Sequence, residues 1–340
     1  MQVKVLDWPS SLPLLRETHK IWSAGLSFAD YLAYNHKQRC SFWGKRNLRL
    51  MALSRNGEIL SSLKLYRLSL QSRGKSFPFF GIGAMYTPER QRGKGHALAL
   101  VERIMQMAIE EQAAGLLLYS DIGADFYEQA GFIACGGLSF SITLPKLPEE
   151  EKKLAALGLA GYQRSPLNKE HTDLVLRHYR RWLSRSSFGY VREEDYLTYK
   201  IEKESFLHEK SRLAWPGLQI LHDINIDMET GTNFYAIIEM AGSTLRVLEL
   251  GGEGAWQAVL AHCLRENIRK IKGWEGVLAE LAPGFRLDSL LSRQLNRPVT
   301  DFSFTFQERS WGLPMLLPLE SSVETWCDAI PCPIPELDHL

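Results

Sequence analysis

The sequence lacks an excess of charge of either sign. Forty lysines and arginines stand against 39 aspartates and glutamates in 340 residues, which gives a formal net charge of +1. Nucleic-acid-binding domains usually carry a basic patch or stripe, whereas basic residues here form only short clusters such as residues 90–94. A cluster of that size suits a small polyanionic ligand better than a duplex. We therefore expect no nucleic-acid partner.

Long hydrophobic runs are also missing. A helix that crosses a bilayer needs about 20 consecutive, mostly apolar residues, and no segment approaches that length. The first ten residues, MQVKVLDWPS, contain one lysine with no apolar core behind it, which does not fit a secretory signal peptide. These absences predict a protein without a membrane partner.

Cysteine is scarce, with five residues at positions 40, 135, 263, 327 and 332. Their odd number and scattered spacing argue against a disulfide framework and for a reducing compartment. Cys327 and Cys332 lie close together, but the next histidine is His339, so the spacing does not predict a zinc site. We expect ordinary thiols, no metal and a cytoplasmic location.

The composition that remains is that of a soluble globular protein. Hydrophobic residues make up 45% and charged residues 23% of the chain, close to the average for such proteins. At roughly 150 residues per domain, 340 residues allow two domains. The chain is therefore long enough to bury two hydrophobic cores.

The first half alternates helical and strand patterns. Asn56-Gly57 marks a tight hairpin turn, because both central residues of that turn need positive φ. The run at 116–119 is continuously apolar, as in a strand buried on both faces, and residues 95–111 carry an apolar stripe at helical spacing. Ser27 is a candidate N-cap. The pattern predicts strands at 3–6, 48–54, 58–71, 77–86, 116–119 and 132–144, and helices at 9–22, 28–38, 95–111 and 124–129.

The second half repeats much of this order. Residues 145–151, rich in proline and then in glutamate, read as a linker. Helices are predicted at 174–185, 193–208 and 255–269, and strands at 218–224, 233–240, 244–251, 276–281 and 300–307. Three strands, a helix and further strands recur, which indicates a degenerate internal duplication.

One glycine-rich segment points to chemistry. It joins a predicted strand to an amphipathic helix, where glycines can expose backbone N–H groups and the helix N-terminus favours a phosphate. Its basic side chains add charge against a pyrophosphate, although a tight turn with solvated basic residues is an alternative. A P-loop is excluded because His96 and Ala97 follow Gly95, and a dinucleotide fingerprint is excluded because position 98 is leucine. The segment consists of Arg92, Gly93, Lys94, Gly95, His96 and Ala97.

The segment resembles the acyl-CoA signature of the GNAT superfamily of N-acetyltransferases, Arg/Gln-x-x-Gly-x-Gly/Ala, at Arg92, Gly95 and Ala97. A second unit typical of the family, Tyr-x-x-x-Gly-Phe, begins about thirty residues later at Tyr127. The resemblance covers about residues 1–144. The run 118–127 is similar to the fungal lysine N-acetyltransferase-like family, and the two-part layout is similar to that of Eis-like acetyltransferases.

The resemblance implies an α+β fold, with a GNAT domain whose mixed central sheet is flanked by helices and a degenerate GNAT-like domain behind it. We predict a GNAT domain at 1–144, a linker and helical segment at 145–217, and a second domain at 218–340 that walls the substrate cleft. The implied activity is acetyl transfer from the co-substrate acetyl-CoA to a primary amine of a small molecule, lysine-like or an amino sugar. A protein or peptide acetyltransferase and a non-catalytic CoA-binding regulator are the alternatives, and homo-oligomerisation stays open.

The resemblance also implies a site. Backbone groups of Ala84, Met85 and Tyr86 would hold the pantetheine arm and polarise the thioester, and Tyr127 would protonate the departing thiolate. The general base is less defined, since the family's usual glutamate is missing from residues 77–86. Asp121 is the first candidate, with a turn or N-cap carboxylate as its alternative role. Asp125, a water beside Tyr119 and the carboxylate of Leu340 are the others.

The second half has a turn at the matching position, residues 251–255, before its predicted helix. This turn contains no basic residue and carries Glu253, which would repel a pyrophosphate, so we expect it to bind no CoA. Possible amine-facing groups nearby, each with a structural alternative, are Glu239, Glu249, Trp274 and Glu275.

Overall fold

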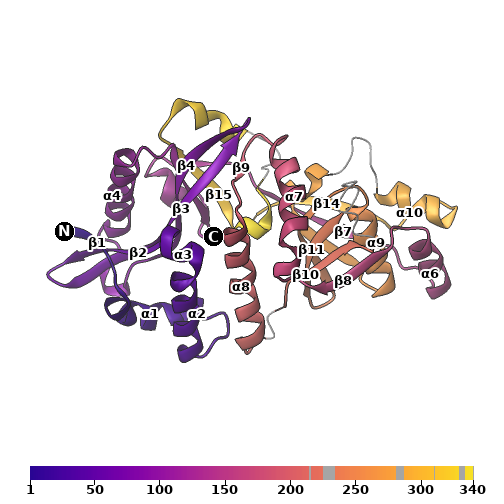
Figure 1. The fold of residues 1–340 in the computed structure, drawn as a ribbon, viewed down its shortest axis with the longest axis horizontal. Helices are drawn as coiled ribbons and strands as arrows, with labels where there is room; N and C mark the ends of the chain where they lie inside the picture. Colours follow the sequence, from indigo (N-terminus) through magenta and orange to yellow (C-terminus); the bar gives the residue numbers. More distant parts are fainter. Residues whose placement is uncertain (214–215, 225–233, 281–286, 310, 329–333, 340) are drawn as a thin grey trace.

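The computed structural model describes the chain except residues 214–215, 225–233, 281–286, 310, 329–333 and 340, and the side chains of 278–280 and 327–328. Cys332 and Leu340 therefore lie outside the described residues. Two β-sheets lie side by side, each covered by helices, and helix α8 stands between them (Figure 1). No helix in the part of the chain described here is long and apolar enough to cross a membrane.

The first half follows the predicted order closely. Ser27 caps α2 as expected, accepting from the Asp30 N–H at 3.1 Å. Asn56 and Gly57 adopt φ of 49° and 83°, which confirms the hairpin turn. The elements are β1 (Gln2–Val5), α1 (Trp8–Trp22), α2 (Phe28–Cys40), α3 (Phe42–Asn47), β2 (Leu48–Arg55), β3 (Glu58–Ser72), β4 (Lys75–Tyr86), η1 (Glu89–Gln91), α4 (His96–Glu110), β5 (Gly115–Ser120), α5 (Asp125–Glu128), β6 (Ile133–Ala134) and β7 (Leu138–Thr143).

The second half departs from the prediction in several places. The helix at Leu287–Leu295 and the strands at Tyr162–Pro166 and Leu313–Pro318 were not predicted. A helix, α6, begins within the expected linker, and residues 275–280 form a 3-10 helix where a strand was expected, because the strand ends earlier, at Trp274. The elements are α6 (Glu149–Leu157), β8 (Tyr162–Pro166), η2 (Lys169–His171), α7 (Thr172–Leu183), β9 (Gly189–Tyr190), α8 (Glu194–Lys210), β10 (Gln219–Asp223), β11 (Tyr235–Ala241), β12 (Thr244–Gly251), α9 (Ala255–Arg265), β13 (Lys270–Trp274), η3 (Glu275–Glu280), α10 (Leu287–Leu295), β14 (Ser303–Glu308), β15 (Leu313–Pro318), η4 (Ser321–Asp328) and η5 (Glu336–Asp338).

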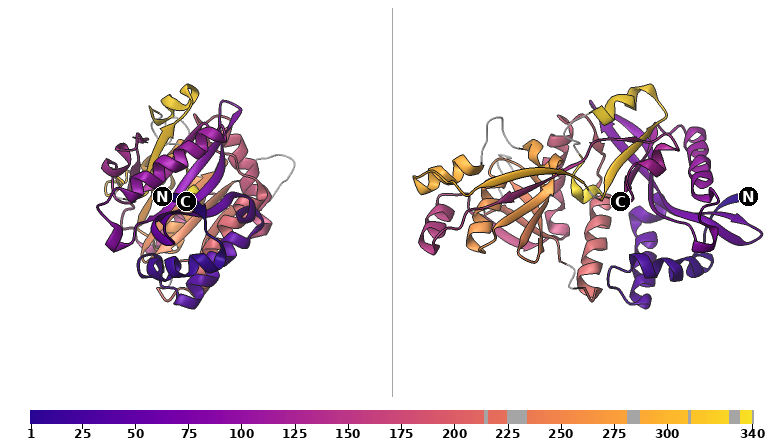
Figure 2. Two further views of the ribbon diagram at one scale, coloured as in Figure 1. Left: turned by 90° about the vertical axis from the view of Figure 1, so that its left-hand side faces the viewer. Right: turned by 180° about the vertical axis from the view of Figure 1, so that it is seen from behind.

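The two sheets exchange strands. The first runs β1-β2-β3-β4-β5-β15-β6, with β9 beside β3, and the second runs β14-β7-β13-β12-β11-β10-β8. Strand β7, expected to complete the first sheet, thus lies in the second, and β15 from the end of the chain lies between β5 and β6 (Figure 2). No single cut near residue 144 separates the sheets, so the division into three domains stays a proposal.

Each sheet contains the same crossover. In the first, β4 leads through α4 to β5, which pairs with β4 in parallel; in the second, β12 leads through α9 to β13, which pairs with β12 in parallel. The remaining neighbouring pairs are antiparallel, so both sheets are mixed. Two mixed sheets flanked by helices agree with the predicted GNAT fold, and the repeated crossover is compatible with the predicted GNAT-like second domain.

Helices bury both faces of the first sheet. On one face, α4 packs its apolar stripe, including Leu100 and Ile104, against strands β2 to β5. On the other face, Trp43 and the α8 tyrosines Tyr196 and Tyr199 pack against Tyr66 of β3. Helix α8 therefore joins the first sheet to the second, where Leu197 and Ile201 pack with Ile220 and its neighbours.

The cysteines differ from expectation at one position. Cys40 is exposed and Cys263 is buried, both as free thiols. Cys135, however, is disulfide-bonded, so the prediction of ordinary thiols is wrong for this residue. No spacing pattern pointed to this bond, because no other cysteine lies within ninety residues of Cys135 on either side.

Candidate functional site

The glycine-rich turn begins where β4 ends. After the short helix η1, Arg92 is extended, and Gly93 and Gly95 adopt positive φ of 72° and 76°. Gly95 is the N-cap of α4. Since few side chains tolerate this conformation, the two glycines are what allows the chain to turn sharply into the helix.

The space above this turn is open. A Cβ built on Gly93 or Gly95 would meet no atom within 4 Å. No side chain caps the N-terminus of α4, so the N–H groups of its first turn have no partner within the helix. Arg92 and Lys94 are exposed beside them. Open space, free N–H donors and two cations together fit a phosphate-bearing ligand. The six predicted residues form the turn that borders this open space.

Strands β4 and β5 separate before β4 reaches the turn. The parallel pairing of the two strands ends at Ile82 and Leu118, although β4 continues to Tyr86. A bulge in the pairing with β3 falls at Ala84, whose φ is 45°. Beyond Ile82 the backbone of β4 therefore has no β5 partner. The predicted positions Ala84, Met85 and Tyr86 all lie on this unpaired stretch, where an extended ligand can add alongside the strand.

Tyr127 lies on α5, on the α4 side of the sheet. It packs in the same buried cluster as Ile82, Leu118 and Met85, next to the split. Burial, and secondarily the charge of Asp121, raises the pKa of Tyr127 to about 12. The phenol therefore stays protonated through the neutral range and can act as a proton donor.

Asp121 follows β5 in an exposed turn. Its Oδ1 accepts a hydrogen bond from the Gly312 N–H at 2.9 Å. This is a structural contact with a distant segment and not the N-cap or turn role that was its alternative. Asp125 is exposed on the first turn of α5. Tyr119 points to the other face, where its hydroxyl lies 3.2 Å from that of Tyr190. Of the base candidates, only Asp121 is shown to act electrostatically on Tyr127, and Leu340 lies outside the described residues.

The matching turn of the second half has the same backbone but no open space. Gly254 is the N-cap of α9 with φ of 99°. A Cβ on Gly254 would lie 3.2 Å from the Phe234 ring, and Trp256 of the first helical turn is buried. Aromatic rings thus occupy the space that is open above Gly95.

The acidic candidates of the second half hold the structure together. Glu239 pairs with Arg246 at 3.1 Å, and Glu275 accepts from the Leu138 N–H at 3.1 Å. Glu249 pairs with Arg192 at 2.5 Å, where both side chains are buried. Trp274 lies in a group of aromatic rings with Tyr119, Trp311 and His339. Each of these four residues therefore has the structural role that was given as its alternative.

A second polar region, which the sequence did not indicate, lies on the face of the first sheet opposite α4. Lys64 of β3 stands opposite Gly83 in the register, at the bulge. Its Nζ donates to Gln38 Oε1 at 3.3 Å, and the Tyr199 hydroxyl donates to the same oxygen at 3.2 Å. Tyr199 in turn is hydrogen-bonded to Tyr66. A signal that could have pointed to this region is the group of tyrosines with a lysine on the predicted helix 193–208.

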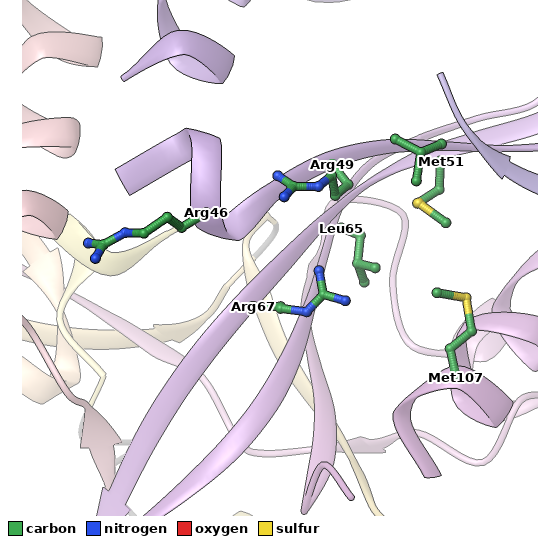
Figure 3. Close-up of a pocket in the computed structure, with 7 residues that line it drawn as sticks. Arg46, Arg49, Met51, Leu65, Arg67 and Met107 are labelled. Carbon is green, nitrogen blue, oxygen red and sulfur yellow. The ribbon is translucent and has the colours of Figure 1, made fainter. Parts of the chain in front are cut away.

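A surface groove of about 400 Å³ lies away from both regions (Figure 3). Three arginines line it over an apolar floor, but two have partners: Arg46 pairs with Asp195, and Arg67 pairs with Glu111 at 2.7 Å. The groove reaches Met107, near the C-terminal end of α4 and opposite the glycine-rich turn. It is therefore separate from the predicted cofactor site. Its lining residues are Val5, Arg46, Arg49, Met51, Leu65, Arg67 and Met107.

Comparisons with known proteins agree with this geometry. Residues 17–134 match the model of an acetyltransferase (GNAT) domain. A search among functionally curated proteins finds no significant match. Similar solved structures include a protein from Enterococcus faecalis described as a probable N-acyltransferase, at 13% identity and a TM-score of 0.64 over 93% of this chain and 72% of that one.

Two further structures share the fold. A GCN5-related N-acetyltransferase from Anabaena variabilis has a TM-score of 0.59 at 16% identity, covering 93% of this chain and 72% of its own. Eis1 from Mycobacterium abscessus has a TM-score of 0.54 at 14% identity, covering 96% and 75%. At such identities the likeness establishes the fold alone. The similarity to the fungal family is not confirmed by the matches described above and stays a prediction.

Proposed function

We propose that this protein, which carries a GNAT-type acetyltransferase domain over residues 17–134, transfers an acetyl group from acetyl-CoA to the primary amine of a small molecule. The observation that carries the proposal is the open turn at Gly93 and Gly95, with free N–H donors at α4, joined to the split between β4 and β5. A cytoplasmic location is part of the same proposal.

Each element of the site has a chemical task in this proposal. The first turn of α4, with Arg92 and Lys94, binds the pyrophosphate. The unpaired backbone of Gly83 to Tyr86 positions the pantetheine arm and polarises the thioester carbonyl. The amine nitrogen attacks that carbonyl carbon, the C–S bond breaks, and Tyr127 gives its proton to the sulfur. Asp121, or a water next to it, removes the proton that the amine loses.

The protonation of Tyr127 supports this assignment. With a pKa of about 12, the phenol holds its proton throughout the neutral range, so it can give that proton to the departing thiolate. Since no described residue forms a hydrogen bond with the Tyr127 hydroxyl, that proton is not committed elsewhere in the described structure. A positioned proton donor of this kind contributes about a hundredfold or more to the rate.

The test is the release of free thiol from acetyl-CoA in the presence of a panel of amines, together with calorimetric binding of acetyl-CoA. We expect binding and turnover for the wild type, and for Tyr127→Phe a fall in kcat of about a hundredfold with unchanged binding. Tyr162→Phe is the matched control, because Tyr162 lies in the second sheet beside His262. Acetyl-CoA binding without turnover of any amine would favour the regulator, and no binding at all would end the proposal.

A further inference from the structure

The arginine-lined groove lies on the α4 face of the first sheet, near the C-terminal end of that helix (Figure 3). Met51 and Leu65, which line it, are 3% and 1% exposed and pack in the cluster beneath α4, so they form its floor. The volume of the groove is about 400 Å³, and natural small-molecule sites measure roughly 300–1,000 Å³. The groove is therefore large enough for a ligand.

The register of β2 and β3 brings two of these arginines together. Arg49 of β2 is opposite Leu65 of β3, and Arg67 follows Leu65 by two residues, so both arginines lie on the same face of the sheet. Such diagonal neighbours are about 7–8 Å apart. In Figure 3 the guanidinium groups lie towards one end of the groove, and the sulfur atoms of Met51 and Met107 lie towards the other. The groove therefore has a basic end and an apolar end.

Two of the three arginines have acidic partners within the protein. Arg67 donates from Nε to Glu111 Oε2 at 3.1 Å and from Nη2 to Glu111 Oε1 at 2.7 Å. One edge of the guanidinium thus binds both oxygens of a carboxylate, the arrangement that makes arginine–carboxylate pairs strong and specific. Arg46 pairs with Asp195. The charges of these two arginines are therefore matched.

Arg49 has no such partner. Its Nη1 donates to the carbonyl oxygens of Lys45 and Leu48, at 2.8 and 2.9 Å, where helix α3 ends. In the described part of the chain, Nε and Nη2 of Arg49 have no hydrogen-bond partner, and no carboxylate lies within ion-pair distance. The edge with which Arg67 binds Glu111 is thus free on Arg49, and the two carbonyl contacts hold it in position. Among the lining residues and their ion-pair partners, three guanidinium groups meet two carboxylates, which leaves one positive charge.

We propose that the groove binds a small monocarboxylate with an unbranched hydrocarbon tail, at a site separate from that of acetyl-CoA. The carboxylate pairs with Nε and Nη2 of Arg49, in the arrangement seen at Arg67, and supplies the one negative charge that the groove lacks. The tail lies over Met51 and Leu65 towards Met107. Methionine side chains are flexible and polarizable and adapt to such an apolar chain. A cationic ligand would be repelled by the arginines.

The test compares octanoate with octanamide in isothermal titration calorimetry. The two molecules have the same tail and differ by one charge, so the ratio of their affinities reports the carboxylate contact. We expect octanoate to bind about tenfold or more tightly than octanamide, the scale of one charge-assisted pair. Each methylene removed from the tail should weaken binding by up to about fourfold. Arg49→Gln should bring the ratio towards one. Arg55→Gln, which changes an exposed arginine at the far end of the same strand, should leave it unchanged.

The methyl resonances of the methionines locate the ligand in NMR spectra. Octanoate should shift the signals of Met51 and Met107 and leave that of Met85, on the unpaired stretch of β4, in place. Acetyl-CoA should shift the signal of Met85 instead. Because Arg49 also holds the end of α3, Met107→Glu repeats the test if Arg49→Gln does not fold. This variant brings a carboxylate to the apolar end of the groove and should weaken the binding of octanoate but not that of acetyl-CoA.

Four results would overturn the inference and leave the proposed acetyl transfer standing. They are equal affinity for octanoate and octanamide, a shift of the Met85 signal by octanoate, competition between octanoate and acetyl-CoA, and no binding of octanoate at all. Failure of acetyl-CoA to bind would instead remove the proposed function and leave the ligand of the groove unaffected.

Discussion

The buried ion pairs around Arg192 allow a quantitative prediction about stability. The guanidinium is fully buried and binds two carboxylates: Nε to Asp338 Oδ1 at 2.9 Å and Nη1 to Glu249 Oε1 at 2.9 Å. It also lies 3.6 Å from the centre of the Tyr179 ring. One cation thus joins β12, the segment before α8 and the segment after Pro335. Since two anions share one cation, the group carries a net charge of −1.

Because of this net charge, we expect removal of the cation to lower the free energy of unfolding far more than removal of one anion. Arg192→Met leaves Glu249 and Asp338 buried together without a cation, which should cost about 3–5 kcal/mol or more. Asp338→Asn leaves Arg192 with Glu249, a balanced pair, and the asparagine oxygen still accepts one hydrogen bond. That change should cost about 1–2 kcal/mol, the scale of lost hydrogen bonds.

The assay is urea unfolding at pH 7, followed by circular dichroism and tryptophan fluorescence in parallel. Arg67→Met is the surface control, because Arg67 and Glu111 are 37% and 42% exposed and an exposed pair contributes less than about 1 kcal/mol. The reasoning about net charge would be refuted if Asp338→Asn destabilised the protein as much as Arg192→Met. It would also be refuted if Arg192→Met unfolded at the same urea concentration as the wild type.

Three further predictions concern the turn and α8. Arg92→Ala should weaken acetyl-CoA binding by about tenfold, because one charge-assisted contact is lost. The assay is calorimetry, with Arg293→Ala as the control, because Arg293 is exposed on α10 and its variant should bind acetyl-CoA as the wild type does. Gly95→Val should weaken binding further, because the φ of 76° is strained for valine and the side chain would enter the open space; equal affinity would contradict a cofactor site here. Lys200 has a folded pKa of about 7 against roughly 10.4 unfolded, so the unfolded chain holds more protons between these values. The free energy of unfolding of the wild type should therefore rise relative to Lys200→Met by up to about 4 kcal/mol from pH 7 to pH 10, as urea titrations at several pH values would reveal; parallel curves would disprove a desolvated lysine.

The parts of the site that the sequence predicted are those made by neighbouring residues. The glycine-rich turn, its helix and Tyr127 lie within about forty residues, and their chemistry depends on local backbone geometry, such as the positive φ at Gly95. The hairpin at Asn56-Gly57 was predictable for the same reason. Their spacing in the chain was enough to place them around one split in the sheet.

The rest depends on contacts between distant segments. Strand β15 lies inside the first sheet, between β5 and β6. Pro314 and Pro318 within it argue against a strand with neighbours on both sides, since proline cannot donate to a neighbouring strand. Lys64 reads as one polar residue of an alternating strand. Its side chain loses water because segments distant in the chain pack around it, among them α2, whose Gln38 accepts a hydrogen bond from Lys64. No local pattern contains that information.

The exchange of β7 and β15 has a consequence for how the protein is made. Strand β5 pairs with β15, which the ribosome delivers roughly 200 residues later, or about 10–40 s at ordinary rates of synthesis. Until then the apolar edge of β5 has no neighbour on that side, and an open apolar edge invites pairing with other chains. We therefore expect the nascent first half to bind chaperones. Ribosome-bound chains that stop near residue 144 should aggregate or recruit chaperones, whereas chains extended past Pro318 should not.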